Sequence, residues 1–536
     1  MRWDVLYLIL GWTVGALTVP LALVGIATAF LDDAQMALIA FLPSTLLAMG
    51  SSWLMLRYGT TPETPDRLRD REAFATVALA YPVVVAFGAM PFWLGGMFHG
   101  PFTADVTLLA AMEGLIHSGF EAMSGFTTTG TTIIDVSTSP NCFANTEDCI
   151  GAQSRGLLLW RSTMQWLGGM GVIMLSMVVL SRVLGGGMAL ARAELTGPSL
   201  SRLRPKLAQT AQALWIMYLV LTLLEIALLI GLTPMNTFEA VNHGLTTMPS
   251  GGFSTTDDSI GHWDSAALES IILVFMFLAG VNFTLLYFIV QRQPGKMWAD
   301  EEFKTYIAYL AGATTIITAA LYLKGGDVGG EPLRKSLFQV VAIATSTGYG
   351  TADYMLWPVI AQIVILMLMV VGASAGSTAG GLKLLRISLA VKVARRQLNR
   401  LTHPRRIHTV RMNGEQVEQE QVELIVGMLL VWILLFAGAS LLLALIMAPM
   451  GEDLDVLTVI GVTASALGNT GPAMGQFGPA VTWAAMPNGG LILTGILMWF
   501  GRLELLTAVI LFSPSTWREP GARKKDVDEE DQNSVV

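Results

Sequence analysis

Long apolar segments alternate with short polar ones along almost the whole chain. A helix needs about 20 apolar residues to cross the hydrocarbon core of a bilayer. Ten segments reach or approach this length, and they lie at 5–30, 35–56, 73–98, 157–181, 211–233, 266–291, 303–323, 355–381, 421–448 and 488–512. This pattern predicts an all-α polytopic membrane protein with ten transmembrane helices. An even number of crossings places both termini on one side of the membrane.

Composition agrees with this class of protein, because 53% of the 536 residues are hydrophobic, 13% are charged and the mean hydropathy is +0.58. Lys and Arg side chains in connecting segments remain on the cytoplasmic side. Most of the 32 basic residues fall in one alternating set of segments, namely the N-terminus, 57–71, 182–206, 292–304, 386–411 and 518–525. The protein is therefore expected to be a multi-pass protein of the cytoplasmic (inner) membrane with both termini in the cytoplasm.

The opposite set of segments is acidic. Its basic residues are Arg155, Arg161, Lys324, Arg334 and Lys335. An acidic outer face concentrates cations near an entrance, although any exposed loop also needs charge for solvation. Cys142 and Cys149 lie in the same outer set, where a disulfide is permitted. Whether the two cysteines are bonded stays open at this point. Such a disulfide would constrain the loop and would have no catalytic role.

A second pattern is repeated inside the first. Four shorter segments, each half apolar and each between two spans, end in threonine, serine or asparagine next to glycine. They read "GFEAMSGFTTTGTT" (119–132), "VNHGLTTMPSGGFSTT" (241–256), "LFQVVAIATSTGYGT" (337–351) and "VIGVTASALGNTGPAMG" (459–475). Each is too short to span the membrane but long enough to enter it and return. An internal repeat of this kind indicates that the architecture is built from copies of one unit.

The repeat divides the chain into two leading helices and four span–loop–span units. We expect four pseudo-symmetric helix–pore-loop–helix units around one pore, with four re-entrant loops. The expected divisions are 1–60 for the two leading helices, 72–182, 208–292, 302–395 and 420–513 for pore units one to four, and 514–536 for a polar cytoplasmic tail of disordered composition.

The chemistry of these loops suits a cation. Extended backbone is tolerated at membrane depth only where it is buried in protein or lines water. Glycine permits a positive φ, which lets successive carbonyl groups point toward a common axis. Rings of carbonyl oxygens replace the hydration shell of an ion, and the negative end of each preceding helix dipole favours a cation. One such loop is explained more simply as a packing glycine, whereas four copies favour a selectivity filter.

The sequence also resembles a known family, the bacterial TrkH potassium-uptake proteins of the Trk/Ktr/HKT superfamily. The resemblance covers nearly the whole chain. It is carried by "FEAMSGFTTTG", "LWRSTMQWLGGMGVIML" (159–175), "GASAGSTAGGLKLLR" (372–386), "SALGNTGP" (465–472) and "GRLELLT" (501–507). It implies a single chain folded as four channel-like units around one filter, with a homodimer as the working assembly. The transported substrate would be potassium, with no bound organic cofactor.

The resemblance also implies which residues hold the potassium ion. They are those just before and at each filter glycine: Thr128, Thr129, Gly130, Ser250, Gly251, Gly252, Ser346, Thr347, Gly348, Asn469, Thr470 and Gly471. In related plant transporters a serine at the first filter glycine accompanies sodium preference. Gly130 stands at that position here, so potassium is favoured.

The eighth apolar segment is interrupted by small residues. They are Gly372, Ser374, Gly376, Ser377, Thr378, Gly380 and Gly381. Freed backbone groups at mid-membrane require a cavity or neighbouring protein. By the resemblance, loop 372–381 lies under the filter and acts as a gate; the alternative is a small-residue packing motif between helices. The run also matches the pattern G-x-S-x-G, but no strand, histidine or acid supports a nucleophile there, so no enzyme is expected.

Two basic residues, Lys383 and Arg502, lie at or near membrane depth, where an ionisable group is a functional candidate. One interpretation is that each residue places a fixed positive charge beside the cavity. The alternative is that the side chain extends to the cytoplasmic surface, and this alternative suits Lys383 better than Arg502. Glu121 and His243 each stand nine residues before a filter glycine. We interpret them as packing groups behind the filter in preference to direct ion contacts.

The basic segment 386–414 suggests a partner. Such a segment binds anionic membrane lipid, whereas the resemblance implies a TrkA-type cytoplasmic nucleotide-binding regulatory subunit. The chain itself carries no nucleotide-binding fingerprint, and no nucleic-acid partner is expected. Two function classes remain: potassium uptake through a channel-like filter, and a sodium- or proton-coupled symporter or less selective Na+/K+ transporter of the same fold.

Overall fold

The computed structural model describes residues 3–60, 70–104, 106–171, 207–324, 331–403, 409–417 and 419–503, together with Leu511 and Trp517. Expectations for the basic stretch 182–206, for the motif residues 504–507 and, apart from Trp517, for the tail 514–536 lie outside these residues.

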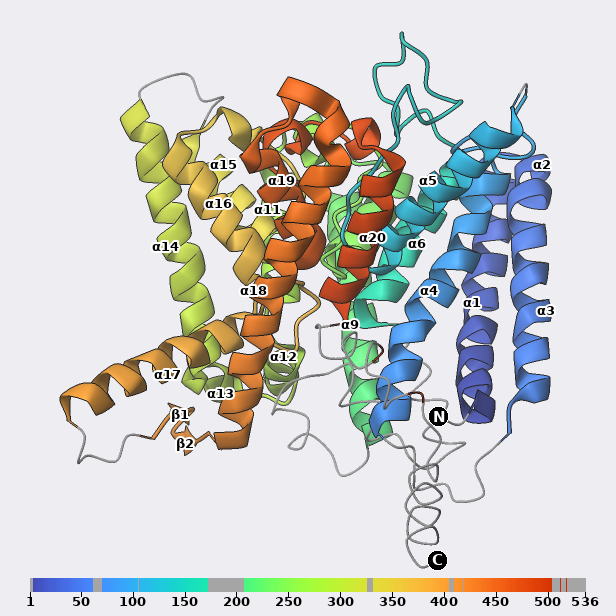
Figure 1. The fold of residues 1–536 in the computed structure, drawn as a ribbon. Helices are drawn as coiled ribbons and strands as arrows, with labels where there is room; N and C mark the ends of the chain where they lie inside the picture. Colours follow the sequence, from blue (N-terminus) through green and yellow to red (C-terminus); the bar gives the residue numbers. More distant parts are fainter. Residues whose placement is uncertain are drawn as a thin grey trace, which may run out of the picture.

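The chain begins with a helical hairpin at one side of the molecule, drawn in blue in Figure 1. It consists of α1 (Trp3–Leu31), the short α2 (Ala34–Met36), a π-helical turn (Ala37–Phe41) and α3 (Leu42–Tyr58). The carboxylate of Asp33 caps α2 by accepting the N–H of Met36 at 2.6 Å. Small residues let the two long helices approach closely, and Ser52 Oγ donates to Gly11 O at 2.8 Å.

The remaining helices form the body of the molecule. They are α4 (Asp70–Leu94), α5 (Leu108–Phe126), α6 (Arg155–Met170), α9 (Leu207–Leu232), α10 (Thr237–Thr247), α11 (Ala266–Ala279), α12 (Phe283–Val290), α13 (Pro294–Ala299), α14 (Glu301–Lys324), α15 (Pro332–Ala344), α16 (Val359–Val371), α17 (Leu384–Thr402), α18 (Gln419–Met447), α19 (Val456–Gly468) and α20 (Asn488–Arg502). Short 3-10 turns cover Ser259–Trp263, Tyr354–Leu356, Ala448–Asp453, Gly475–Phe477 and Trp483–Ala485. Strands β1 (Arg411–Met412) and β2 (Glu415–Gln416) form an antiparallel hairpin.

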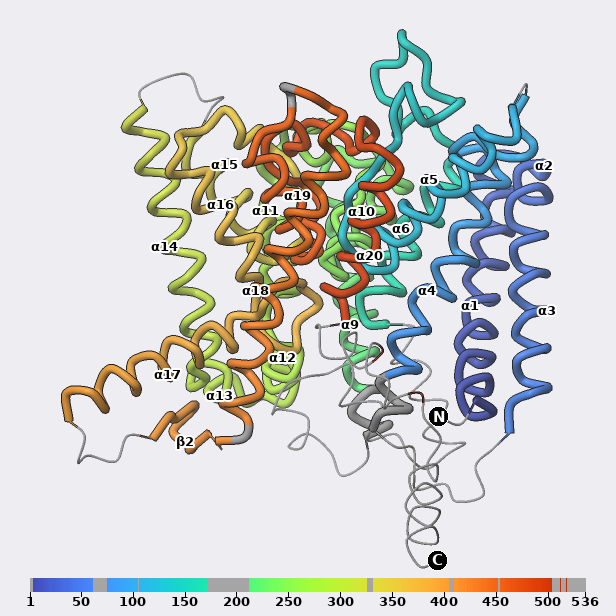
Figure 2. Tube along the Cα trace, in the orientation of Figure 1, coloured from blue at the N-terminus to red at the C-terminus, as the bar shows by residue number. Residues whose placement is uncertain are grey.

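These helices pack in a closed cycle. Helices α5, α10, α15 and α19 are the short helices that precede the four repeated loops. Each packs against the helix that follows the previous loop: α6 against α10, α11 against α15, α16 against α19, and α20 back against α5. The last contact joins the fourth segment to the first, so segments far apart in the sequence meet in the middle of the molecule (Figure 2).

Within the described residues, six helices are long and apolar enough to cross a membrane, or seven if the bent pair α11 and α12 counts as one span. Ten spans remain an expectation. Helices α6, α16 and α20 are 16, 13 and 15 residues long in the described part of the chain. The expected span 266–291 is not one straight helix, since α11 and α12 meet at 104°.

The bend between α11 and α12 has a local cause. Asn282 begins α12, and its side chain accepts the N–H of Thr284 at 2.8 Å. The N–H of Phe283 donates to Gly376 O at 3.0 Å. A backbone donor that would have continued the first helix therefore bonds to the interrupted eighth segment, which places loop 372–381 against this bend.

Candidate functional site

Each of the four short helices ends in a loop with the same backbone conformation. The residue two before each filter glycine has a positive φ, as does the glycine itself, whereas the residue between them does not. The φ values are 53° and 84° for Thr128 and Gly130, 59° and 76° for Ser250 and Gly252, 54° and 78° for Ser346 and Gly348, and 50° and 100° for Asn469 and Gly471. Alternation in the sign of φ turns successive carbonyl groups to one side of the chain.

The amide groups of these loops bond in the other direction, back into the helix ends. The residue before each filter glycine donates its N–H to a helix carbonyl five residues earlier. The four bonds are Thr129 to Ser124 at 2.9 Å, Gly251 to Thr246 at 2.9 Å, Thr347 to Ala342 at 2.9 Å and Thr470 to Ser465 at 3.0 Å. Because backbone donors must be paired when buried, these bonds fix the loops and direct the N–H groups away from the carbonyl side.

The four loops meet in one ring. A Cβ atom built on each filter glycine would collide with a carbonyl oxygen of the next loop in the cycle. Gly130 faces Gly251 O, Gly252 faces Thr347 O, Gly348 faces Thr470 O, and Gly471 faces Thr129 O. The contacts pass from the first loop to the fourth and return to the first. No side chain larger than hydrogen fits at these four positions without displacing a carbonyl of the neighbouring loop.

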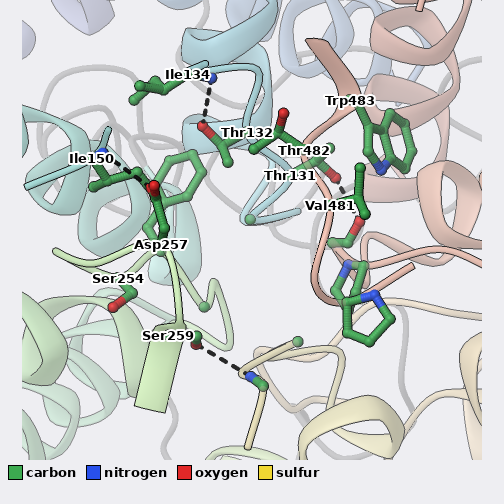
Figure 3. Close-up of a pocket in the computed structure, with 18 of the residues that line it drawn as sticks. Thr131, Thr132, Ile134, Ile150, Ser254, Asp257, Ser259, Val481, Thr482 and Trp483 are labelled. Atoms are coloured by element: carbon green, nitrogen blue, oxygen red, sulfur yellow. Dashed lines mark hydrogen bonds between the residues drawn. The ribbon is translucent and has the colours of Figure 1, made fainter. Parts of the chain in front are cut away.

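All four filter glycines open onto one cavity of about 290 Å³. Figure 3 shows its polar lining, which includes Thr131, Thr132, Ser254 and Asp257. Asp257 accepts the N–H groups of Cys149 at 2.7 Å and Ile150 at 3.0 Å. Burial raises the pKa of Asp257, and these two bonds oppose the rise. The cavity therefore has a carboxylate in its wall that is held by the preceding outer loop.

Loop 372–381 contacts the residues before the glycines, away from this cavity. Thr378 Oγ1 lies 2.9 Å from Ser250 Oγ and donates to Met248 O at 3.0 Å. The N–H of Gly380 donates to Ser346 Oγ at 2.6 Å. Gly372, Gly376 and Gly381 all have a positive φ. The structure thus brings the interrupted segment directly against the second and third loops.

Three comparisons with known proteins bear on this arrangement. Residues 102–519 match the family TrkH, described as a cation transport protein. The chain belongs to the TrkH family. The Trk system potassium uptake protein TrkH of Halomonas elongata is 32% identical over 483 residues, covering 90% of this chain and 92% of that protein. TrkH of Escherichia coli K12 is 31% identical over 481 residues, covering 88% and 90%.

A solved structure extends this likeness to the fold. The crystal structure of the potassium transporter TrkH from Vibrio parahaemolyticus is similar with a TM-score of 0.80 and 27% identity, covering 97% of this chain and 100% of that one. The resemblance to the TrkH family read from the sequence is confirmed. The relatives are potassium transport proteins of membranes and not enzymes, which agrees with the class expected from composition.

The TrkH-family motif 501–507 begins at the end of α20, where Arg502 is half-buried. Its guanidinium donates to Thr378 O, Gly168 O and Gly169 O, each at 2.9 Å. Arg502 therefore joins loop 372–381 to the end of α6.

Lys383 is 4% exposed, and its ammonium donates to Ala379 O. Extension of Lys383 to the cytoplasmic surface is therefore wrong, because the side chain folds back onto the loop.

A buried ion pair lies behind the first two loops of this TrkH-family chain. Arg161 is 2% exposed, and its Nε lies 2.7 Å from Glu121 Oε1. Glu121 also accepts from Thr132 Oγ1 at 3.0 Å and from the N–H of Ile133 at 3.2 Å. Arg161 donates to Ser254 O at 3.0 Å. Arg161, counted with the charges of the outer segments, is thus buried in the protein, where it lines the cavity together with the four filter glycines.

His243, at the position of the second repeat that Glu121 holds in the first, is also buried. Its Nδ1 lies 2.8 Å from Glu239 O and its Nε2 3.1 Å from Ser254 Oγ.

Cys142 and Cys149 form a disulfide in the outer segment. It closes a loop of the first unit whose N–H groups at 149 and 150 bind Asp257 of the second.

Arg161 and Gln165, whose side chains bond the backbone of the second loop, were not singled out from the sequence. Both are buried and both lie on α6, four residues apart. Residues at i and i+4 share a face of a helix, and polar side chains within an apolar span mark functional sites. This signal is present in "LWRSTMQWLGG" and could have identified them.

Proposed function

We propose that this protein takes up potassium across the cytoplasmic membrane through a filter formed by the four Thr/Gly-rich loops. The observation that carries the proposal is the closed ring, in which each filter glycine lies against a carbonyl oxygen of the next loop and all four open onto one cavity. Carbonyl oxygens in such rings replace the hydration shell of a cation. The filter residues are Thr128 to Gly130, Ser250 to Gly252, Ser346 to Gly348 and Asn469 to Gly471.

Loop 372–381 is the gate in this proposal. It lies against the filter on the side away from the cavity, and its bonds to Ser250 and Ser346 and from Arg502 must break for an ion to pass. Glu302 of α14 accepts the N–H of Ala375 at 2.6 Å. The positive charge of Arg502 beside Thr378 disfavours a cation below the filter while the loop is closed.

The regulatory part of the proposal concerns the cytoplasmic side. Helix α17 and the hairpin β1–β2 lie at the end of the molecule opposite the outer loop that contains Cys142 and Cys149 (Figure 1). Helix α17 carries the basic residues Lys392, Arg395, Arg396 and Arg400. We assign this end, with both termini, to the cytoplasm. The partners in this proposal are a TrkA-type nucleotide-binding regulatory subunit, a second copy of the chain and membrane lipid.

The second candidate function is potassium transport coupled to a sodium or proton gradient, and one buried residue supports it. Glu225 lies within α9, a candidate span, and is 0% exposed. Among the described residues no basic side chain forms an ion pair with it. Ionisable groups inside the membrane mark proton or ion pathways in transporters. Glu225 is therefore the residue at which proton coupling would act in this chain.

Rubidium-tracer flux tests the proposal. The purified protein is placed in liposomes, and uptake is measured with potassium, sodium or lithium as the competing ion, with and without a proton gradient. We expect uptake along the potassium gradient, inhibited by potassium far more than by sodium or lithium. Uptake that all three ions inhibit equally would contradict a potassium filter.

A further inference from the structure

The second filter loop differs from the other three at its middle residue. Thr129, Thr347 and Thr470 precede their filter glycines, but Gly251 stands at this position in the second loop. Gly251 does not have a positive φ. The backbone conformation therefore does not require glycine there, and another cause must explain the missing side chain.

The cause is Gln165 of α6. A Cβ atom on Gly251 would collide with the amide group of Gln165, which is 0% exposed. The side chain of Gln165 therefore fills the space that threonine fills in the other loops. Thr129 Oγ1 lies 2.8 Å from Thr127 Oγ1, and Thr347 Oγ1 lies 2.9 Å from Thr345 Oγ1. The second loop has Pro249 two residues before Gly251 and so cannot form the same hydroxyl pair.

Gln165 also bonds the filter backbone at two points. Its Nε2 donates to Gly251 O at 2.7 Å, and its Oε1 accepts the N–H of Phe253 at 3.1 Å. Gly251 O is the carbonyl that faces Gly130 in the ring. Within the described part of the chain, the corresponding carbonyls of Thr129, Thr347 and Thr470 accept no hydrogen bond. One of the four ring oxygens is thus held by a side-chain donor from outside the loop.

The geometry points to Gln165 as a positioning residue that sets ion discrimination by fixing the Gly251 carbonyl. This inference rests on the proposed potassium filter and deepens it. A carbonyl oxygen has two lone pairs, so Gly251 O can accept the amide and still face a cation. The amide restrains the oxygen at one distance from the axis. Without this restraint the carbonyl can move toward a smaller ion, which lowers discrimination against sodium.

The test is the rubidium flux assay with Gln165→Met, which keeps the length of the side chain and removes both bonds. We expect the preference for potassium over sodium to fall on the order of fivefold, the factor that one net hydrogen bond of about 1 kcal/mol corresponds to. Gln362→Met is the matched control. Gln362 of α16 donates to Met355 O and Trp357 O, and neither of these acceptors belongs to a filter loop. The Gln362→Met variant should therefore leave ion preference unchanged.

Two further variants separate positioning from space filling. Gln165→Glu keeps the acceptor for Phe253 but removes the donor to Gly251, and we expect it also to lose preference. The double variant Gln165→Ala with Gly251→Thr gives the second loop the side chain of the other three, and we expect it to recover preference relative to Gln165→Ala.

The outcomes distinguish this inference from the proposed function. Wild-type protein without potassium preference would overturn the filter itself. A selective wild type with equally selective Gln165→Met and Gln165→Glu variants would overturn the role of Gln165 alone. If Gln165→Met fails to elute as folded protein in size-exclusion chromatography, the role of Gln165 is judged from Gln165→Glu alone. A Gln165→Glu variant as selective as the wild type would then overturn that role.

Discussion

A side chain on Gly130 has no room, because Gly251 O occupies the space where a Cβ atom would lie. Gly130 also has a φ of 84°, at which an L-residue is strained by about 1–3 kcal/mol. We therefore expect Gly130→Ser to lower potassium-over-sodium preference by about tenfold, the equivalent of 1.4 kcal/mol, while assembly is retained. Competitive rubidium flux measures this change.

Gly451→Ser is the control for backbone strain alone. Gly451 has a φ of 74° with nothing within 4 Å of a built Cβ atom. Full potassium-over-sodium selectivity in Gly130→Ser would contradict the assignment of Gly130 to the selectivity filter.

The Arg161–Glu121 pair gives a second prediction for single residues. Removing one partner of a buried ion pair leaves an uncompensated charge and costs about 3–5 kcal/mol. We expect Arg161→Met to lower the thermal unfolding midpoint clearly, and the double variant with Glu121→Gln to be less destabilised than the sum of the two single changes. Arg155→Met is the control, because Arg155 is exposed on the same helix. Additive effects would show that the two charges are not coupled.

Among the structural elements, loop 372–381 is where a small change should affect rate more than selectivity. Thr378 Oγ1 contacts Ser250 Oγ, Met248 O and Ala279 O, and Thr378→Val removes these bonds with little change in shape. We expect the loop to open more often, with rubidium flux several-fold higher and ion preference unchanged. Deleting 374–378 should raise flux further.

Thr315→Val tests whether the loss of any threonine hydroxyl has this effect. Thr315 is exposed on α14 and donates only to Ala311 O within its helix in the described structure. Flux that stayed the same after the deletion would exclude a gating role for the loop.

The sequence predicted those elements that depend on local pattern. Loop 126–132 could be found because its Thr-Gly step recurs in three other segments, and the break at 372–381 because glycines interrupt an apolar run. The bend at Gly280 to Asn282 was missed, since apolar residues continue on both sides of it. The i, i+4 spacing of Arg161 and Gln165 was visible in the sequence, but their partners on the second loop were not, because these contacts depend on α6 packing against the next unit.

For the whole molecule, the cyclic packing explains how one chain can bring four loops together in the proposed filter. Each loop is supported by the helix of the preceding unit, as Gln165 of α6 supports Gly251. A side chain of one unit thus bonds directly to the loop of the next. This connection explains how the disulfide loop of the first unit holds Asp257 of the second.

The energy source for uptake is also a property of the whole molecule. A filter gated by loop 372–381 needs no second ion, so we expect rubidium uptake to follow the potassium gradient equally with and without a proton gradient. Glu225→Gln should then leave uptake unchanged, because gating by loop 372–381 does not involve the Glu225 carboxyl. Glu423→Gln, an exposed change on α18, serves as the control. Uptake that requires a proton gradient and loses this requirement in Glu225→Gln would instead establish proton-coupled transport, with Glu225 as the proton site.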